Sequence, residues 1–349
     1  MRNPLTRVAT AAAVILAIGI GFIGILHTGG QAAYAFEQTV EAMQGKRSFH
    51  IRTYVQSRPK DEFWAEFDEA GRLVRFRQEE ERDHYFGPVV TIWEDGVRSQ
   101  FVPRPFGINL VTRVANVDGE LEGLEGFDPE EVVQEAYDQV TAGAATLETE
   151  EPSSDKDLIT VTVTVTEAHS LRRVLLVNRA TKLLVRMDDD RQDLDGGRHR
   201  HFGVDVFAYN EPIDPNLYVL SLPEGTITID QVSQEVGMAQ ENLTDDQIAP
   251  KVARRAMEAW GKGDYVHAGK LFGGAPPEYF TERYKELRPV RIISIGQPVP
   301  VPYIKPWFRV PCQYEVEQDG QITTTELMLN VLAVDGQPGR WYVAIQHKA

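Results

Sequence analysis

The sequence predicts an α+β fold, and three observations lead to this prediction. A long apolar run opens the chain, short segments of alternating apolar and polar residues follow, and helical segments precede further strands near the C-terminus. Alternation with period two is typical of strands with one buried face, whereas spacings of three and four residues are typical of amphipathic helices. A chain of 349 residues is long enough for two soluble domains after the apolar run.

The composition is that of a folded, acidic protein. Hydrophobic residues make up 42% of the chain and charged residues 25%, which argues against general disorder. The net charge of the chain is −16. Residues 1–28 contain Arg2 and Arg7 and no acidic residue, so the chain after residue 28 carries −18. Nucleic-acid binding is therefore not expected. The single cysteine, Cys312, excludes an internal disulfide and a Cys-x-x-Cys zinc motif.

Residues 1–30 predict a membrane anchor or an export signal. The run from Val8 to Leu26 contains no charge, and about 20 such residues span a bilayer core. Arg2 and Arg7 precede the run and place the N-terminus in the cytoplasm. The length of the run favours a retained anchor, although Ala35 ends an A-x-A motif at which a signal could be cleaved. Both interpretations place the body beyond the inner membrane, in the periplasm.

A short amphipathic helix is expected from Ala35 to Lys46, and strands follow it. Alternation begins at Phe49 and continues through turns at 68–71 and 94–96 to Phe101, which predicts successive antiparallel hairpins with one apolar face. A second helix is expected from Pro129 to Gly143, because Asp128 is a good N-cap and proline suits the first turn.

The region around this second helix is strongly acidic. Val114 to Asp155 carries thirteen Asp or Glu and no Lys, Arg or His. A solvated surface is one interpretation, and a docking site for a basic protein surface is the other. The alternation from Ile159 to Thr166 then predicts a further strand with hydroxyl groups on one face.

The stretch DDDRQDLDGGRHRHF, from Asp188 to Phe202, raises the question of a metal site. An EF-hand loop aligned on Gly196 fails, because Arg191 stands at position 1 and Phe202 at position 12. His199 and His201 share a strand face, but local spacing supplies no third ligand. We therefore expect a hairpin with a polar strand edge and no metal.

Two stretches resemble the outer-membrane lipoprotein carrier superfamily, which contains LolA, LolB and RseB-like proteins. They are AFEQTVEAMQGKRSFHIRTYVQ at Ala35–Gln56 and the segment Tyr209–Gly225, in which a strand ends at prolines and a short turn returns Leu217 and Tyr218 to the core. The resemblance covers residues 35–232. It implies a curved antiparallel half-barrel over helices that encloses an apolar cavity for acyl chains or lipoprotein segments.

The apolar face of the predicted hairpins would line this cavity. The candidate ligand-binding residues are Phe49, Ile51, Phe63, Phe67, Val74, Phe76 and Ile92. The alternative is that these side chains fill the core, in which case the domain is an envelope interaction module.

A second domain is expected at 247–349, after a polar linker at 233–246. Ile248, Val252 and Ala256 follow helical spacing, and Asp264 can cap a second helix after Gly263. A third helix and four strands follow. The stretch ARRAMEAWGKGDYVHAGKLF resembles NTF2-like (cystatin-like) α+β domains, which form a cone around a pocket.

No motif in the sequence indicates catalysis. The chain contains no G-x-S-x-G, H-E-x-x-H or P-loop pattern. Cys312 lies in a strand pattern, and Trp260 and Trp307 are expected to pack the core. His267 and Asp264 are the candidates for an enzymatic alternative in the C-terminal pocket. We predict binding or sensing of a lipid, lipoprotein segment or apolar peptide, with no enzyme activity and no cofactor.

Overall fold

The computed structural model describes residues 36–81, 87–103, 108–115, 128–150, 157–165, 170–192, 199–284, 288–302, 306–318 and 320–344. The chain forms two compact units. Unit 1 comprises the chain up to Leu73 and Leu121–Ile213, and unit 2 comprises Val74–Glu120 and Asp214–Ala349. These units divide the chain differently from the predicted domains at 35–232 and 247–349, whose boundaries stay a prediction.

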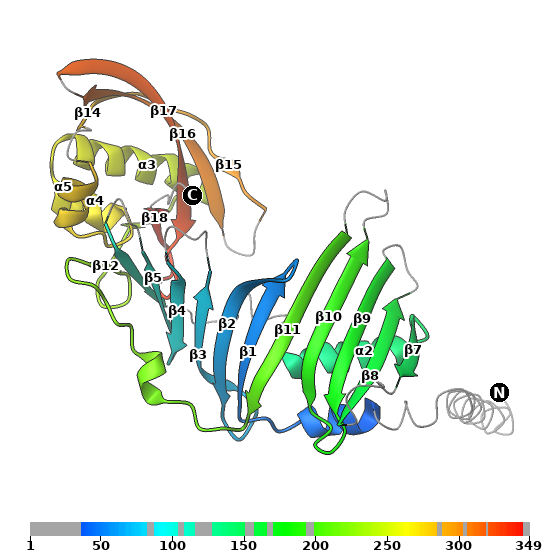
Figure 1. Cartoon of the computed structure of the whole chain (residues 1–349). Coiled ribbons are helices and arrows are strands. Elements are labelled where there is room, and N and C mark those ends of the chain that lie inside the picture. The colour runs from blue at the N-terminus through cyan, green and yellow to red at the C-terminus, as the bar shows by residue number, and fades with distance from the viewer. Residues whose placement is uncertain are drawn as a thin grey trace, which may run out of the picture. The chain divides into compact units, whose positions relative to one another are not determined.

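Unit 1 is a curved antiparallel sheet, as Figure 1 shows. The order of its strands is β2-β1-β11-β10-β9-β8-β7, and every neighbouring pair is antiparallel. Their bounds are β1 (Ser48–Val55), β2 (Arg58–Phe67), β7 (Ala145–Glu150), β8 (Leu158–Val165), β9 (Ser170–Asn178), β10 (Leu184–Gln192) and β11 (His199–Tyr209). The predicted antiparallel sheet is confirmed here.

Two helices belong to unit 1, a short one at residues 36–43 and α2 (Pro129–Thr141). Asp128 accepts a hydrogen bond from the backbone N–H of Glu130, and Pro129 occupies the first turn, so the predicted start of α2 is confirmed. Val132, Val133 and Ala136 form the buried side of the helix.

The first part of unit 2 contributes neighbouring strands in the order β12-β6-β5-β4-β3. Its elements are β3 (Leu73–Glu80), β4 (Val89–Glu94), β5 (Val97–Val102), β6 (Leu110–Ala115), the 3₁₀ helix η1 (Pro215–Tyr218) and β12 (Ile227–Asp230). The strand that follows Gly225 was expected, but β12 lies parallel to β6, which the hairpin pattern did not predict.

The C-terminal part of unit 2 packs three helices against a second sheet. The order of that sheet is β13-β18-β17-β16-β14, and β15 also pairs with β16. The bounds are α3 (Asp245–Gly261), α4 (Tyr265–Leu271), α5 (Pro277–Arg283), β13 (Met238–Ala239), β14 (Arg288–Ile295), β15 (Val299–Pro300), β16 (Trp307–Gln318), β17 (Gln321–Ala333) and β18 (Arg340–Ala344). The predicted order of helices followed by strands is confirmed, whereas the NTF2-like cone remains a resemblance.

The predicted linker at 233–246 is held by the C-terminal sheet. Val236 is fully buried, and the Arg340 guanidinium donates hydrogen bonds to the carbonyls of Val236 (2.6 Å) and Gly237 (2.8 Å). The Gln337 amide donates to the carbonyl of Gln234 (2.8 Å). This segment is therefore packed, although its composition is that of a linker.

The predicted membrane segment from Val8 to Leu26 lies outside the described residues. Within the part of the chain that the structure describes, no helix combines the length and the apolar character that crossing a membrane requires.

Candidate functional site

The apolar face of the sheet in unit 1 is formed by alternating residues of β1 and β2. The register pairs Phe49 with Ala65 and Ile51 with Phe63, and all four residues are at most 1% exposed. Opposite residues of an antiparallel pair point to the same face, so these four form one continuous apolar layer. The Phe67 ring lies 5.7 Å from the Phe49 ring, at the edge of this layer. Four predicted cavity residues therefore lie together.

The other three predicted cavity residues belong to unit 2 and do not share one face. Phe76 of β3 opposes Trp93 of β4, whereas Ile92 opposes Arg77. Because successive residues of a strand point to opposite faces, Phe76 and Ile92 point away from each other. Val74 is 41% exposed.

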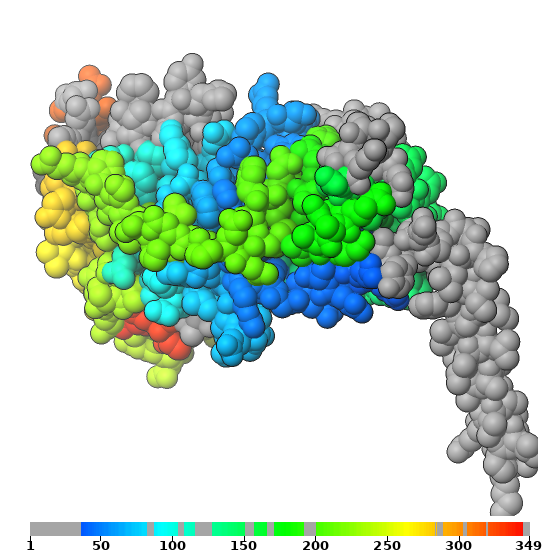
Figure 2. Space-filling view, turned by 60° about the horizontal axis from the view of Figure 1, so that its bottom comes forward, coloured from blue at the N-terminus to red at the C-terminus, as the bar shows by residue number. Residues whose placement is uncertain are grey.

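Helix α2 and the helix of residues 36–43 cover the buried side of unit 1. Phe36 and Met43 are at most 1% exposed, and the Phe36 ring lies 6.0 Å from the ring of Tyr137 on α2. The Tyr137 hydroxyl donates a hydrogen bond to Glu37 (3.0 Å), which joins the two helices. In the space-filling view, residues 36–43 (dark blue) and the green strands form a continuous surface (Figure 2).

Lys46 attaches the start of α2 to the sheet. Its ammonium group donates to Asp128 (2.5 Å) and Glu130 (2.8 Å) and lies 4.9 Å above the Phe67 ring. The Lys46 side chain is only 7% exposed. The contact joins the N-cap of α2 to the edge of the apolar layer.

Arg173 of β9 attaches the middle of α2. Its guanidinium forms a bidentate ion pair with Asp189 of β10 (2.8 and 3.0 Å) and a further ion pair with Glu135 of α2 (3.1 Å). Burial alone would lower the pKa of Arg173, but hydrogen bonds to Asp189 and Glu135 outweigh burial and raise the pKa above its ordinary value. Arg173 and Asp189 therefore form a buried charged pair within the sheet, and Glu135 joins Arg173 to the helix.

Neither Lys46 nor Arg173 was selected from the sequence, although a signal for the second contact was present. Asp189 stands between Asp188 and Asp190, so the alternation places it on the opposite face from both. That face also holds Met187, which is buried. An acidic residue on the same strand face as core residues needs a buried cation beside it. Arg173 supplies this cation, because it lies opposite Asp189 in the pairing of β9 with β10.

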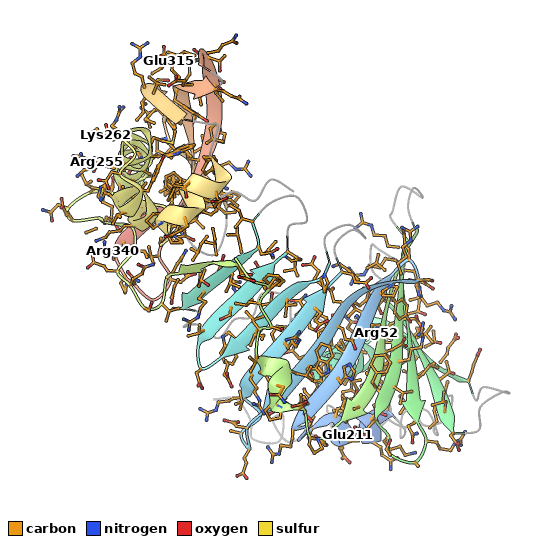
Figure 3. The ribbon with its side chains drawn as sticks, turned by 60° about the vertical axis from the view of Figure 1, so that its left-hand side comes forward. Arg52, Glu211, Arg255, Lys262, Glu315 and Arg340 are labelled. Carbon is orange, nitrogen blue, oxygen red and sulfur yellow. The ribbon has the colours of Figure 1, made fainter. Side chains whose placement is uncertain are left out.

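The other face of the sheet carries a chain of paired ionisable groups. Arg52, which projects from β1 in Figure 3, bonds to Glu62 (3.0 Å), and His50 bonds to the same carboxylate (2.7 Å). Burial would raise the pKa of Glu62, but the hydrogen bonds from His50 and Arg52 lower it below its ordinary value. The His50 ring also stacks on Trp64 at 4.8 Å and contacts Phe207 at 4.9 Å.

The Asp-rich stretch that raised the metal question forms ion pairs on this same face. His201 lies between Asp188 (3.2 Å) and Asp190 (2.9 Å), and Arg186 bonds to Asp188 and Asp205. No group of three or more possible metal ligands occurs among the described residues. The side chains from Asp193 to His199 lie outside the description.

The residues of the enzymatic alternative do not form a site. His267 is exposed on α4, and Asp264 caps that helix by accepting from the His267 backbone N–H (3.1 Å). Cys312 is 1% exposed, and burial raises the pKa of its thiol to about 11. The thiol is thus poorly nucleophilic at neutral pH. Trp260 packs against Tyr284 in the core, as predicted.

Cys312 also lines a cavity of about 310 Å³ on the C-terminal sheet. Its wall comes from three strands and includes Ser294, Gly296, Pro311, Gln313, Glu326 and Met328. The wall contains neither His267 nor Asp264, so the cavity and the candidate acid–base groups are separate.

Comparisons with known proteins give matches among solved structures only. No family model matches the chain, and no curated protein matches it. The Mycobacterium tuberculosis lipoprotein LppX matches with 12% identity and a TM-score of 0.35, covering 53% of this chain and 98% of LppX. The Pseudomonas aeruginosa MucA/MucB complex matches with 13% identity and a TM-score of 0.33, covering 90% of this chain and 91% of the matched chain.

An NTF2-like protein involved in plasmid conjugation also matches, with 13% identity and a TM-score of 0.19, covering 57% of this chain and 72% of that one.

Proposed function

We propose that this protein binds an acyl chain, a lipoprotein segment or an apolar peptide at the apolar layer of unit 1, on the side of the sheet where the helix of residues 36–43 and α2 lie. In this proposal residues 1–30 tether the body to the inner membrane, or are removed after Ala35, so that binding takes place in the periplasm. Occupancy of the site could be passed on to an envelope signalling partner. The proposal assigns no catalytic step.

The observation that supports binding is the way in which the cover is attached. Helix α2 is joined to the sheet by the Lys46 and Arg173 ion pairs, at its start and its middle. The pairs that reach α2 are partly exposed at Glu130 (37%) and Glu135 (56%), so separating one of them costs about 1 kcal/mol. An acyl chain of about twelve methylenes gains roughly 10 kcal/mol on burial. A lipid that displaced one of these contacts would keep most of this gain to set against the free-energy cost of association, which is about 4–15 kcal/mol.

A second candidate rests on the tight packing of the apolar layer. Phe49, Ile51 and Phe63 are at most 1% exposed, which is what a filled core requires. In that case unit 1 is a rigid envelope interaction module, and its ligands bind on the surface.

Native mass spectrometry separates these candidates. We would purify residues 36–349 from an exporting host without harsh detergent, and then add a fatty acid and a diacylated lipopeptide. The first proposal expects a reproducible added mass, and Lys46→Met should increase probe occupancy because the cover is loosened. Arg72→Gln is the matched control, since Arg72 is 80% exposed in its pair with Asp68. An empty wild-type protein that ignores both probes, with Lys46→Met equally empty, contradicts lipid binding and leaves the filled module.

A further inference from the structure

Strand β7 is the last strand in the order of unit 1, and Figure 1 shows it at the free end of the sheet. It pairs with β8 along its whole length, from Ala145 to Glu150, without a register shift. Among the described residues, no strand pairs with its other side. A regular strand of six residues presents unpaired N–H and C=O groups along such an edge.

The edge strand β14 of the C-terminal sheet is built differently. Its pairing with β16 shifts register twice, after Pro289 and after Ile292. Bulges and prolines are common ways in which proteins block an edge against added strands. Strand β7 contains neither proline nor glycine, so its edge remains suitable for pairing.

The acidic residues near the β7 edge favour a partner segment with basic residues. Glu148 and Glu150 are exposed on one face of β7. The neighbouring helix α2 contains four acids, of which Glu130 and Glu135 pair with Lys46 and Arg173, and no Lys, Arg or His occurs from Pro129 to Glu150. A second copy of β7 would bring its own glutamates into the same ladder, where like charges destabilise pairing. A segment with basic residues at alternate positions meets opposite charges instead.

We propose that β7 is a docking edge for an extended basic segment of a partner protein, which adds to the sheet as a further strand. Main-chain hydrogen bonds would hold the segment, and Lys or Arg at alternate positions would face Glu148 and Glu150. This site is distinct from the apolar layer, so it does not depend on lipid binding.

The test uses a capped eight-residue peptide, Lys-Val-Lys-Val-Lys-Thr-Lys-Val, and residues 36–349. Binding is measured by fluorescence anisotropy, and backbone hydrogen exchange locates it. We expect binding that protects amides of β7 and weakens about tenfold in Glu148→Lys/Glu150→Lys, since two attractions become repulsions. Glu69→Lys, which changes an exposed turn residue of unit 1, should change the affinity less than twofold.

Two control peptides separate strand addition from general charge attraction. A peptide with N-methyl groups on alternate residues cannot complete the ladder, and a peptide with all lysines at one end lacks the alternation. Both should bind at least tenfold more weakly than the probe peptide. The proposal is overturned if the probe peptide fails to bind at 1 mM, if the controls bind equally well, or if protection appears elsewhere than in β7.

Discussion

Arg173 shows how a single charged residue can hold a helix to a sheet in this protein. Its side chain is 7% exposed, and that of Asp189 is 5% exposed. Water screens such a pair little, so each partner depends on the other for solvation. Asp189 therefore fixes the Arg173 guanidinium in the sheet, and Arg173 in turn pairs with Glu135 of α2 (3.1 Å).

Arg173→Met should lower the free energy of unfolding by about 3–5 kcal/mol, because Asp189 is left buried without its cation. Chemical denaturation measures this change. Arg72→Gln, in an exposed pair, should change the free energy of unfolding by less than about 1 kcal/mol. In the double variant Arg173→Met/Asp189→Leu, most of the stability should return. Equal losses in Arg173→Met and Arg72→Gln would show that burial of the pair has no effect.

Glu62 gives a prediction about pH. Its folded pKa is lowered from 4.5, so its contribution to stability is present above pH 4.5 and is lost as the pH falls through the folded pKa. Glu62→Gln removes this contribution at every pH. The difference in melting temperature between wild type and Glu62→Gln should therefore be largest near neutral pH and shrink below pH 4.5. A constant difference down to pH 2 would contradict the assignment.

At the scale of an element, α2 depends on Asp128 for two separate interactions. The carboxylate caps the helix through the N–H of Glu130 (2.9 Å) and pairs with Lys46 (2.5 Å). Asp128→Ala removes both interactions and should lower the free energy of unfolding by about 2 kcal/mol. Asp128→Asn keeps the cap and should lower the free energy of unfolding by roughly half as much. Urea unfolding of the two variants measures the difference. Equal costs would mean that the cap contributes nothing.

The pairing of β1 with β11 depends on a glycine. Gly203 opposes Tyr54, and a Cβ atom at position 203 would lie 1.9 Å from the tyrosine ring. The ring cannot move without losing the bond from its hydroxyl to Asp188 (2.7 Å). Gly203→Ala should lower the free energy of unfolding by about 2 kcal/mol or more. In the double variant with Tyr54→Ala, most of this steric cost should disappear. A double-mutant cycle with no coupling between the positions would refute this contact.

At the scale of the whole molecule, net charge governs self-association. The chain carries −16 at neutral pH, and its isoelectric point is near pH 5.0. Repulsion between copies should therefore keep residues 36–349 dispersed at pH 7 and weaken as the pH approaches 5. Light scattering as a function of pH should show most association near pH 5. Association that is strongest at pH 7 would point to a specific attractive interface.

Much of the local structure follows from the sequence. The start of α2, the helical spacing in α3, the Asp264 cap and the alternation of β1, β2 and β8 agree with the predicted elements. These features depend on interactions between residues close in the chain, namely caps, turns and the period of burial. The composition likewise determines the strong acidity of the protein. The sequence by itself determined these properties because no distant residue is needed to produce them.

Tertiary structure alone decided which distant segments meet. The alternation of apolar and polar residues predicts that Phe76 and Ile92 each lie on the apolar face of their own strand. Only the pairing of β3 with β4 shows that the two side chains lie on opposite faces of the sheet. The parallel pairing of β12 with β6 and the meeting of Arg173 with Asp189 and Glu135 are of the same kind. A shift of one residue between strands reverses every side chain, and no local pattern encodes that shift. The candidate apolar layer was therefore predictable within β1 and β2, whereas its cover and its charged contacts required the fold.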